Sequence, residues 1–163
     1  LPICKSKKLG TAKHKPILLL SVIDLIAQGL IQKNEINVSK KLVDTFNQYW
    51  YILSSDSHRR GLYYPFYHLQ SDNFWHINFN SDFINALPEK TVTKEDKPKS
   101  LTKLKKIVNY ASFDTELFEL LQYQNHRKEF TDVLIATWFS ANQKDTKELI
   151  IINQNFQKND KQE

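Results

Sequence analysis

The chain lacks the features that mark several large classes of protein. Its 163 residues include one cysteine, Cys4, so no internal disulfide forms and a reducing, cytoplasmic setting is expected. No apolar run approaches the roughly 20 residues that span a bilayer. The N-terminus has no basic start followed by an apolar run and a small-residue cleavage site, the pattern of a secretory signal. We therefore expect a cytoplasmic protein with no membrane partner.

Methionine is absent as well, and the chain begins at Leu1. We therefore expect the sequence to have been excised from a longer protein, whose other domains have to be considered. The length fits one domain with a sizeable core, and a composition of 40% hydrophobic and 25% charged residues is typical of globular proteins.

The sequence also shows no arrangement of residues that supports catalysis. The five histidines have no spacing typical of a zinc site, and a single cysteine cannot complete a site built on thiolates. Glu89, Glu95 and Lys97 have the residue types of a magnesium-dependent nuclease centre, but their hydrophilic, proline-flanked stretch is not the buried strand that such a centre needs. We predict no catalytic residue, no metal and no cofactor.

Positive charge is in excess and unevenly placed. The formal net charge is +5, with a pI near 9.2, and two adjacent arginines, Arg59 and Arg60, stand in the turn-like stretch SSDSHRRG. Clustered basic residues favour the phosphates of nucleic acid, although a solvated lysine-rich tail explains the same pattern. Five lysines precede the first acidic residue, Asp24: Lys5, Lys7, Lys8, Lys13 and Lys15.

The stretch PILLLSVIDLIAQG predicts a helix over Pro16–Gln28, with Gly29 as its C-terminal stop. Its apolar residues cover nearly the whole circumference, so we expect the central helix of the core. His14 and Lys15 then lie at the N-terminal edge of this helix. Unpaired backbone N–H groups and the positive end of the helix dipole make such an edge suitable for a phosphate oxygen.

A second helix is predicted after Ser39, which is a good N-cap. From Leu62 the pattern changes, and the segments YHL, QSDN and FWHINF predict a β-hairpin with one buried face. Pro65 is excluded from a central strand, so we expect the chain to bend there at an edge. The core beneath is assigned to Phe66, Leu69, Trp75 and Ile77.

The C-terminal half is expected to be helical, with one helix from Leu101 to Val108, a second capped by Asp114, and a third that begins near Asn125 and reaches Phe139. The predicted fold class is therefore α+β: a mostly helical single domain with a small antiparallel β-hairpin. A helix pair followed by a hairpin also resembles a winged helix.

Two segments, GTAKHKPILLLSVIDLIAQG and YYPFYHLQSDNFWHI, resemble the two signatures of the N-terminal region of McrA-type HNH restriction endonucleases. In several members that region is a sulfur-binding domain, which recognises phosphorothioate-modified DNA. The later VNYASFDTELFELLQ and FTDVLIATWFS are similar to the helical remainder of these proteins. The resemblance spans roughly Lys8 to Ser140.

The resemblance implies a set of site residues. In the sulfur-binding family, a His followed by Arg or Lys at the start of the central helix, together with a Tyr-Pro pair and a nearby side chain, forms the sulfur pocket. These positions are occupied here by His14 and Lys15, by Tyr64 and Pro65, and by His68. Lys15 stands where Arg is common, and His68 is larger and more polar than the usual small residue, so a related domain that recognises something else stays open.

The chemistry of sulfur agrees with such a pocket. Sulfur in place of a non-bridging phosphate oxygen is larger, more polarizable and less strongly hydrated, so a proline ring and a tyrosine face desolvate it at lower cost, while one cation compensates the charge. One atom supplies only part of the affinity, and basic residues are expected to contact flanking phosphates or base edges. These candidates are Lys5, Lys7, Lys8, Lys13, Arg59 and Arg60.

We therefore predict a non-catalytic module that binds double-stranded, phosphorothioate-modified DNA within a modification-dependent, type IV restriction system. Residues 1–142 are assigned to the DNA-binding domain and residues 143–163 to an extension that leads to a nuclease domain absent from this chain. Two alternatives stay open. One is a winged-helix-like or modified-base reader whose helix after Ser39 enters a groove, and the other is a nuclease that acts alone.

Overall fold

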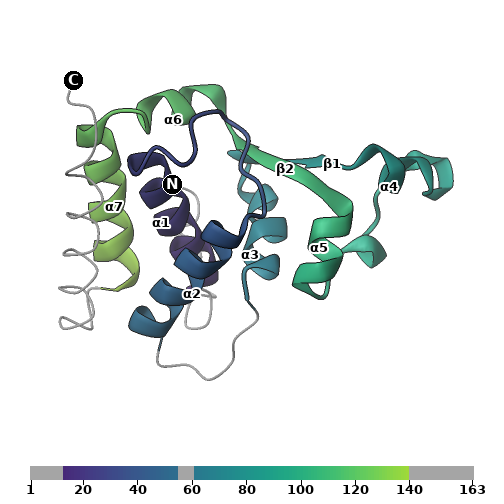
Figure 1. Ribbon diagram of the computed structural model, residues 1–163, viewed down its shortest axis with the longest axis horizontal. Helices are drawn as coiled ribbons and strands as arrows, with labels where there is room; N and C mark the ends of the chain where they lie inside the picture. Colours follow the sequence, from purple (N-terminus) through teal and green to yellow (C-terminus); the bar gives the residue numbers. More distant parts are fainter. Residues whose placement is uncertain (1–12, 55–60, 140–163) are drawn as a thin grey trace.

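The computed structural model describes residues 13–54 and 61–139. Helices surround one central helix, and a two-stranded antiparallel sheet extends to one side (Figure 1). This arrangement confirms the predicted mostly helical α+β class. The elements are α1 (His14–Ala27), α2 (Lys40–Leu53), α3 (Tyr63–His68), η2 (Leu69–Asp72), β1 (Trp75–Phe79), α4 (Ser81–Asn85), η3 (Pro88–Lys90), η4 (Lys94–Asp96), α5 (Leu101–Ile107), β2 (Val108–Phe113), α6 (Thr115–Leu120) and α7 (Gln124–Trp138).

Helix α1 is the central helix that its sequence predicts. All of its residues except Lys15 are buried, and α2, α3 and α7 pack around it. It begins two residues earlier than predicted, so Pro16 is its third residue rather than its first. Proline is still tolerated there, because an N–H in the first turn has no partner within the helix. No helix in the described part of the chain is long and apolar enough to cross a membrane.

Helix α2 begins where its cap predicts. The Ser39 hydroxyl oxygen accepts a hydrogen bond from the Leu42 N–H at 3.1 Å, which satisfies one of the free donors of the first turn. The helix buries one face, with Phe46, Tyr49 and Trp50 among the core residues. Trp50 is placed so that it also contacts the start of α1.

The predicted local hairpin is wrong. Its expected first arm is helical, forming α3 and η2, and β1 pairs instead with β2, from which residues 80–107 separate it. Pro65 lies in the first turn of α3, where its missing N–H costs no hydrogen bond. Phe66 and Leu69 are three residues apart, a helical spacing, and both are fully buried. The hairpin that suggested a winged helix is therefore not formed.

Strand β2 occupies a segment whose start was predicted as helix. Helix α5 ends at Ile107, and Val108 already belongs to the strand. The antiparallel register places Trp75 opposite Phe113 and Ile77 opposite Ala111. A strand of this length needs a partner, and here the partner is distant in sequence.

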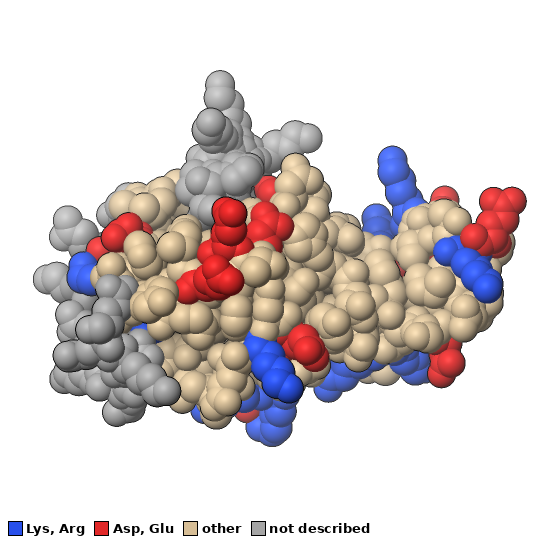
Figure 2. Space-filling model, turned by 90° about the horizontal axis from the view of Figure 1, so that it is seen from above, with Lys and Arg blue, Asp and Glu red and all other residues tan. Residues whose placement is uncertain are grey.

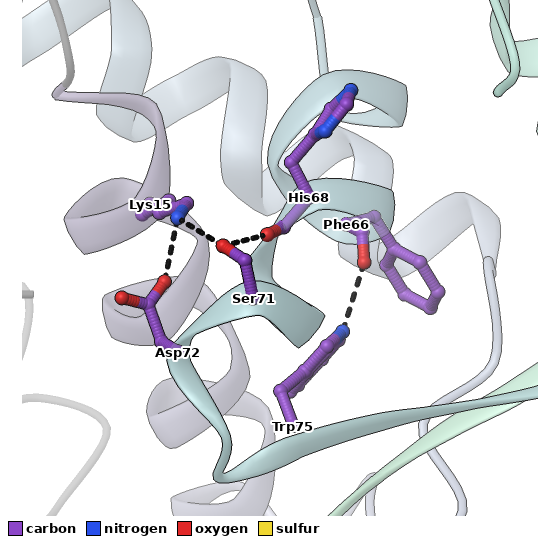
Figure 3. Close-up of polar contacts among 6 residues, drawn as sticks. All are labelled: Lys15, Phe66, His68, Ser71, Asp72 and Trp75. Atoms are coloured by element: carbon purple, nitrogen blue, oxygen red, sulfur yellow. Dashed lines mark hydrogen bonds and ion pairs between the residues drawn. The ribbon is translucent and has the colours of Figure 1, made fainter. Parts of the chain in front are cut away.

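Trp75 joins the sheet to α3. Its indole N–H donates a buried hydrogen bond to the Phe66 carbonyl at 2.8 Å (Figure 3), and its ring meets the Phe66 and Phe113 rings edge to face at 5.3 and 5.2 Å. The side chain is fully buried, as predicted from its core assignment. This contact holds β1 against α3 and encloses the turn through η2.

Asp24 is a charged residue type inside this core. Its side chain is fully buried in α1, and neither carboxyl oxygen has a hydrogen-bond partner within the described residues. Burial therefore raises the pKa of the Asp24 carboxyl well above its usual range. The folded protein therefore favours the protonated form of Asp24. The free energy of unfolding is highest below the unfolded pKa of about 4, where the carboxyl is protonated in both states, and it falls as the pH rises through the folded pKa.

Asp24→Asn removes this ionisation, so we expect the variant to gain free energy of unfolding over the parent as the pH rises from about 4. Urea unfolding of both proteins across that range measures the difference. Asp44→Asn is the control, because the Asp44 carboxylate is exposed on α2. Parallel pH profiles for the parent and Asp24→Asn would contradict a neutral buried carboxyl.

Candidate nucleic-acid interface

The N-terminus of α1 meets α3 through a row of aromatic rings. His14, the first residue of α1, is only 6% exposed, and its ring centroid lies 4.4 Å from that of Trp50 and 5.7 Å, edge to face, from that of Tyr64. The centroid of the Tyr64 ring lies 4.4 Å from that of the His68 ring. We call His14, Tyr64 and His68 the aromatic row. Three residues of the expected sulfur site are thus brought together by two helices.

The residues of this site differ in how much surface they offer to a ligand. Pro65 is buried in α3, and His14 is buried at the start of α1. Tyr64 and His68 are both partly exposed, and their i,i+4 spacing places them on one face of α3. The exposed surface of the expected site is therefore that of Tyr64, His68 and Lys15.

Lys15, the expected cation of the site, is held in an ion pair. Its ammonium nitrogen lies 2.5 Å from an Asp72 carboxylate oxygen and 3.2 Å from the Ser71 hydroxyl, which in turn donates to the His68 carbonyl at 2.9 Å (Figure 3). The side chains of Lys15 and Asp72 are 23% and 15% exposed. This arrangement ties the N-terminus of α1 to the segment that follows α3.

Asp72 is a functional candidate that the sequence interpretation missed. It is the only acidic residue between Asp56 and Asp82, in the stretch that also contains the Tyr-Pro pair. That isolation was the available signal, but nothing in the local pattern linked Asp72 to Lys15. The two are separated by 57 positions and meet only because η2 folds back toward α1.

The structure places one of the six basic residues expected to contact flanking phosphates or bases. Lys13 stands at the N-cap of α1, and its ammonium lies over the Phe139 ring, 5.9 Å from the centroid. This distance is that of a cation–π contact. The others lie outside the described residues: Lys5, Lys7, Lys8, Arg59 and Arg60.

Helix α5 carries basic residues that were not singled out from the sequence. It contacts α3, and it buries Leu104 and Ile107 while its lysines are exposed. Seven lysines and four acidic residues lie within 81–107, whereas 108–139 has two basic and five acidic residues. The exposed lysines of this segment are Lys90, Lys94, Lys97, Lys99, Lys103, Lys105 and Lys106.

The surface charge is therefore asymmetric. Figure 2 looks onto the side of α6 and shows acidic side chains gathered on the body of the molecule there, while the projecting lobe at the right carries lysines together with acidic side chains, the lysines being in excess within 81–107. A phosphate backbone is repelled by the first surface and attracted by the second.

Within 13–54 and 61–139, no group of three or more His, Cys, Asp and Glu side chains is arranged to hold a metal ion.

Comparisons with known proteins bear on the family of this chain. Comparison with curated proteins gives no match. A solved structure described as the sulfur binding domain of ScoMcrA complexed with phosphorothioated DNA is similar in fold, with a TM-score of 0.55 and 20% sequence identity over 85% of this chain and 87% of that one. The model of the family described as ScoMcrA-like, DNA sulfur-binding domain, matches residues 3–151. The chain therefore belongs to the ScoMcrA-like family of DNA sulfur-binding domains.

Proposed function

We propose that this domain binds double-stranded DNA that carries a phosphorothioate linkage, and that the modified linkage contacts the aromatic row at the start of α1. The observation that carries the proposal is the meeting of His14, Tyr64 and His68 beside Lys15 in a chain of this family. The solved relative was determined with phosphorothioated DNA, which supports the same ligand class.

The physical chemistry of the row favours sulfur over oxygen. The faces of the Tyr64 and His68 rings, as distinct from the phenol O–H and the imidazole N–H at their edges, offer a polarizable surface that cannot replace the hydration of a phosphate oxygen. Sulfur loses less hydration free energy on such a surface, so it is the better ligand. The first N–H groups of α1, at the positive end of a 14-residue helix, compensate the negative charge that the linkage keeps.

Affinity for the rest of the duplex is assigned to basic side chains around the row. The exposed lysines of α5 lie on a helix that contacts α3, the element that carries Tyr64 and His68, and we assign them to the phosphates that flank the modified linkage. We assign the same role to the residues expected from the sequence: Lys5, Lys7, Lys8, Lys13, Arg59 and Arg60.

We further propose that the domain is a targeting module of a modification-dependent restriction system, and that cleavage belongs to a separate nuclease domain. Purified chain incubated with Mg²⁺ or Mn²⁺ and modified DNA is expected to leave the DNA intact on a gel. Cleavage products would assign the chain to a nuclease.

The first test compares two identical duplexes that differ by a single phosphorothioate. We expect tighter binding of the modified duplex at every salt concentration, because the sulfur contact is an apolar and dispersion contact that salt screens little. Fluorescence anisotropy titrations at several salt concentrations measure both affinities. Equal affinities for the two duplexes at every salt concentration would reject the proposal that the domain recognises sulfur.

The second test concerns the exposed part of the aromatic row. Tyr64→Leu and His68→Ala are expected to lower the ratio of modified to plain affinity, since each removes a ring from the proposed sulfur contact. Tyr51→Ala is the matched control, because Tyr51 is an aromatic residue that is 88% exposed on α2. If both variants keep the ratio and the melting temperature of the parent, Tyr64 and His68 do not contact the sulfur.

The third test concerns helix α5. The double variant Lys103→Ala/Lys106→Ala is expected to weaken modified and plain duplexes alike and to flatten the plot of log affinity against log salt by about 0.9 for each lost phosphate contact. Lys33→Ala/Lys128→Ala removes the same charge outside α5 and controls for net charge. The proposal for α5 fails if both double variants show the same small loss.

A further inference from the structure

The ion pair between Lys15 and Asp72 stands apart from the other lysine–aspartate pairs of the described residues. Lys40–Asp44 and Lys128–Asp132 each join neighbouring turns of one helix and are mostly exposed. Lys15–Asp72 joins α1 to η2 and is largely shielded from solvent. Exposed pairs have little effect on their surroundings, whereas a shielded pair is screened much less by salt.

We propose that Asp72 determines the selectivity of the site by neutralising Lys15, so that an ordinary phosphate gains little from this lysine. The inference rests on the proposed function, because it concerns the same site. It assigns Asp72 a positioning role: the residue acts through Lys15 rather than by contact with the sulfur.

The argument begins with what an unpaired cation would do. A free ammonium at the start of α1 would attract any phosphate, modified or plain, because both carry one negative charge. That attraction would raise both affinities and would favour most the ligand with the more concentrated charge, which is the plain phosphate. Specificity is the difference between the binding free energies of the two ligands. An attraction that favours plain DNA therefore lowers the specificity for modified DNA.

The ion pair with Asp72 removes most of the attraction between Lys15 and a phosphate. The carboxylate lies 2.5 Å from the ammonium, so a phosphate that approaches Lys15 also approaches Asp72, and attraction and repulsion largely cancel. What remains is the contact with the aromatic row, which distinguishes sulfur from oxygen by polarizability and hydration. Asp72 therefore costs affinity for DNA in general and increases the preference for the modified linkage.

The geometry also indicates how the charge of Asp72 can be tested without moving Lys15. The ammonium keeps a second partner, the Ser71 hydroxyl at 3.2 Å, and Ser71 is itself anchored on the His68 carbonyl. Asparagine at position 72 offers an amide oxygen in place of the carboxylate oxygen, so Asp72→Asn removes the charge while the shape and the acceptor are kept.

The experiment measures the affinities of four proteins for the modified and the plain duplex at several salt concentrations. These are the parent chain, Asp72→Asn, Asp72→Glu and Asp132→Asn. Asp132→Asn makes the same change in net charge on α7, at a carboxylate that pairs with Lys128 rather than with Lys15, and it controls for long-range attraction. Melting temperatures report whether each variant is folded.

We expect Asp72→Asn to bind the plain duplex about tenfold more tightly, the size of one weakly screened charge interaction. The modified duplex should gain less, so the ratio of modified to plain affinity falls several-fold. The salt plot for plain DNA should steepen by about 0.9, because Lys15 now neutralises a phosphate. Asp72→Glu should keep the ratio of the parent, and Asp132→Asn should change neither affinity by more than about twofold.

An unchanged ratio in Asp72→Asn, or an equal loss for both duplexes, would overturn the inference and leave the pair as a structural link between α1 and η2. If Asp72→Asn does not fold, Asp72→Glu and Asp72→Gln provide the same comparison of charge with a longer side chain. The proposed function is judged separately, from the parent chain alone: a parent that binds both duplexes equally rejects it, whereas a selective parent with an unchanged Asp72→Asn ratio rejects only the role of Asp72.

Discussion

The structure depends on the complete burial of α1. A helix that is apolar on every side must be covered on every side, and α2, α3 and α7 supply that cover. Lys15 is the one residue of α1 that is not buried, and it lies at the N-terminus. The candidate site therefore forms where the central helix reaches the surface. The positive end of its dipole, the aromatic row and a charged side chain meet there because the rest of the helix is closed to ligands.

A second contact makes this meeting possible. The indole of Trp75 holds the Phe66 carbonyl, which joins the sheet to α3 across a buried hydrogen bond. The chain between these two residues has to turn through η2, and that turn carries Ser71 and Asp72 to Lys15. A core contact thus positions polar residues of the surface, and the site inherits its rigidity from the packing of the aromatic residues beneath it.

The distribution of charge complements this geometry. Basic residues are in excess on the segment that includes α5, next to α3, whereas the segment from β2 to α7 is acidic. At the N-terminus of α1 the charge of Lys15 is compensated by Asp72. Under the proposed function, long-range attraction for the DNA backbone and discrimination of one atom belong to different residues. The separation is physically reasonable, because a strong local cation would bind every phosphate in the duplex.

Much of this protein could be predicted from the sequence because the relevant information is local. The all-round apolar pattern of α1 determines a buried helix, Ser39 determines where α2 begins, and the two family motifs identify His14 and Tyr64. Tertiary structure decided what depends on distant partners. Trp75 could pair with a neighbouring segment or with β2, and the alternation of its strand fits both, so only packing selects Phe113 as its partner. The meeting of Lys15 with Asp72 was decided in the same way, because an ion pair across 57 positions follows from the folded path of the chain and leaves no periodic trace in the sequence.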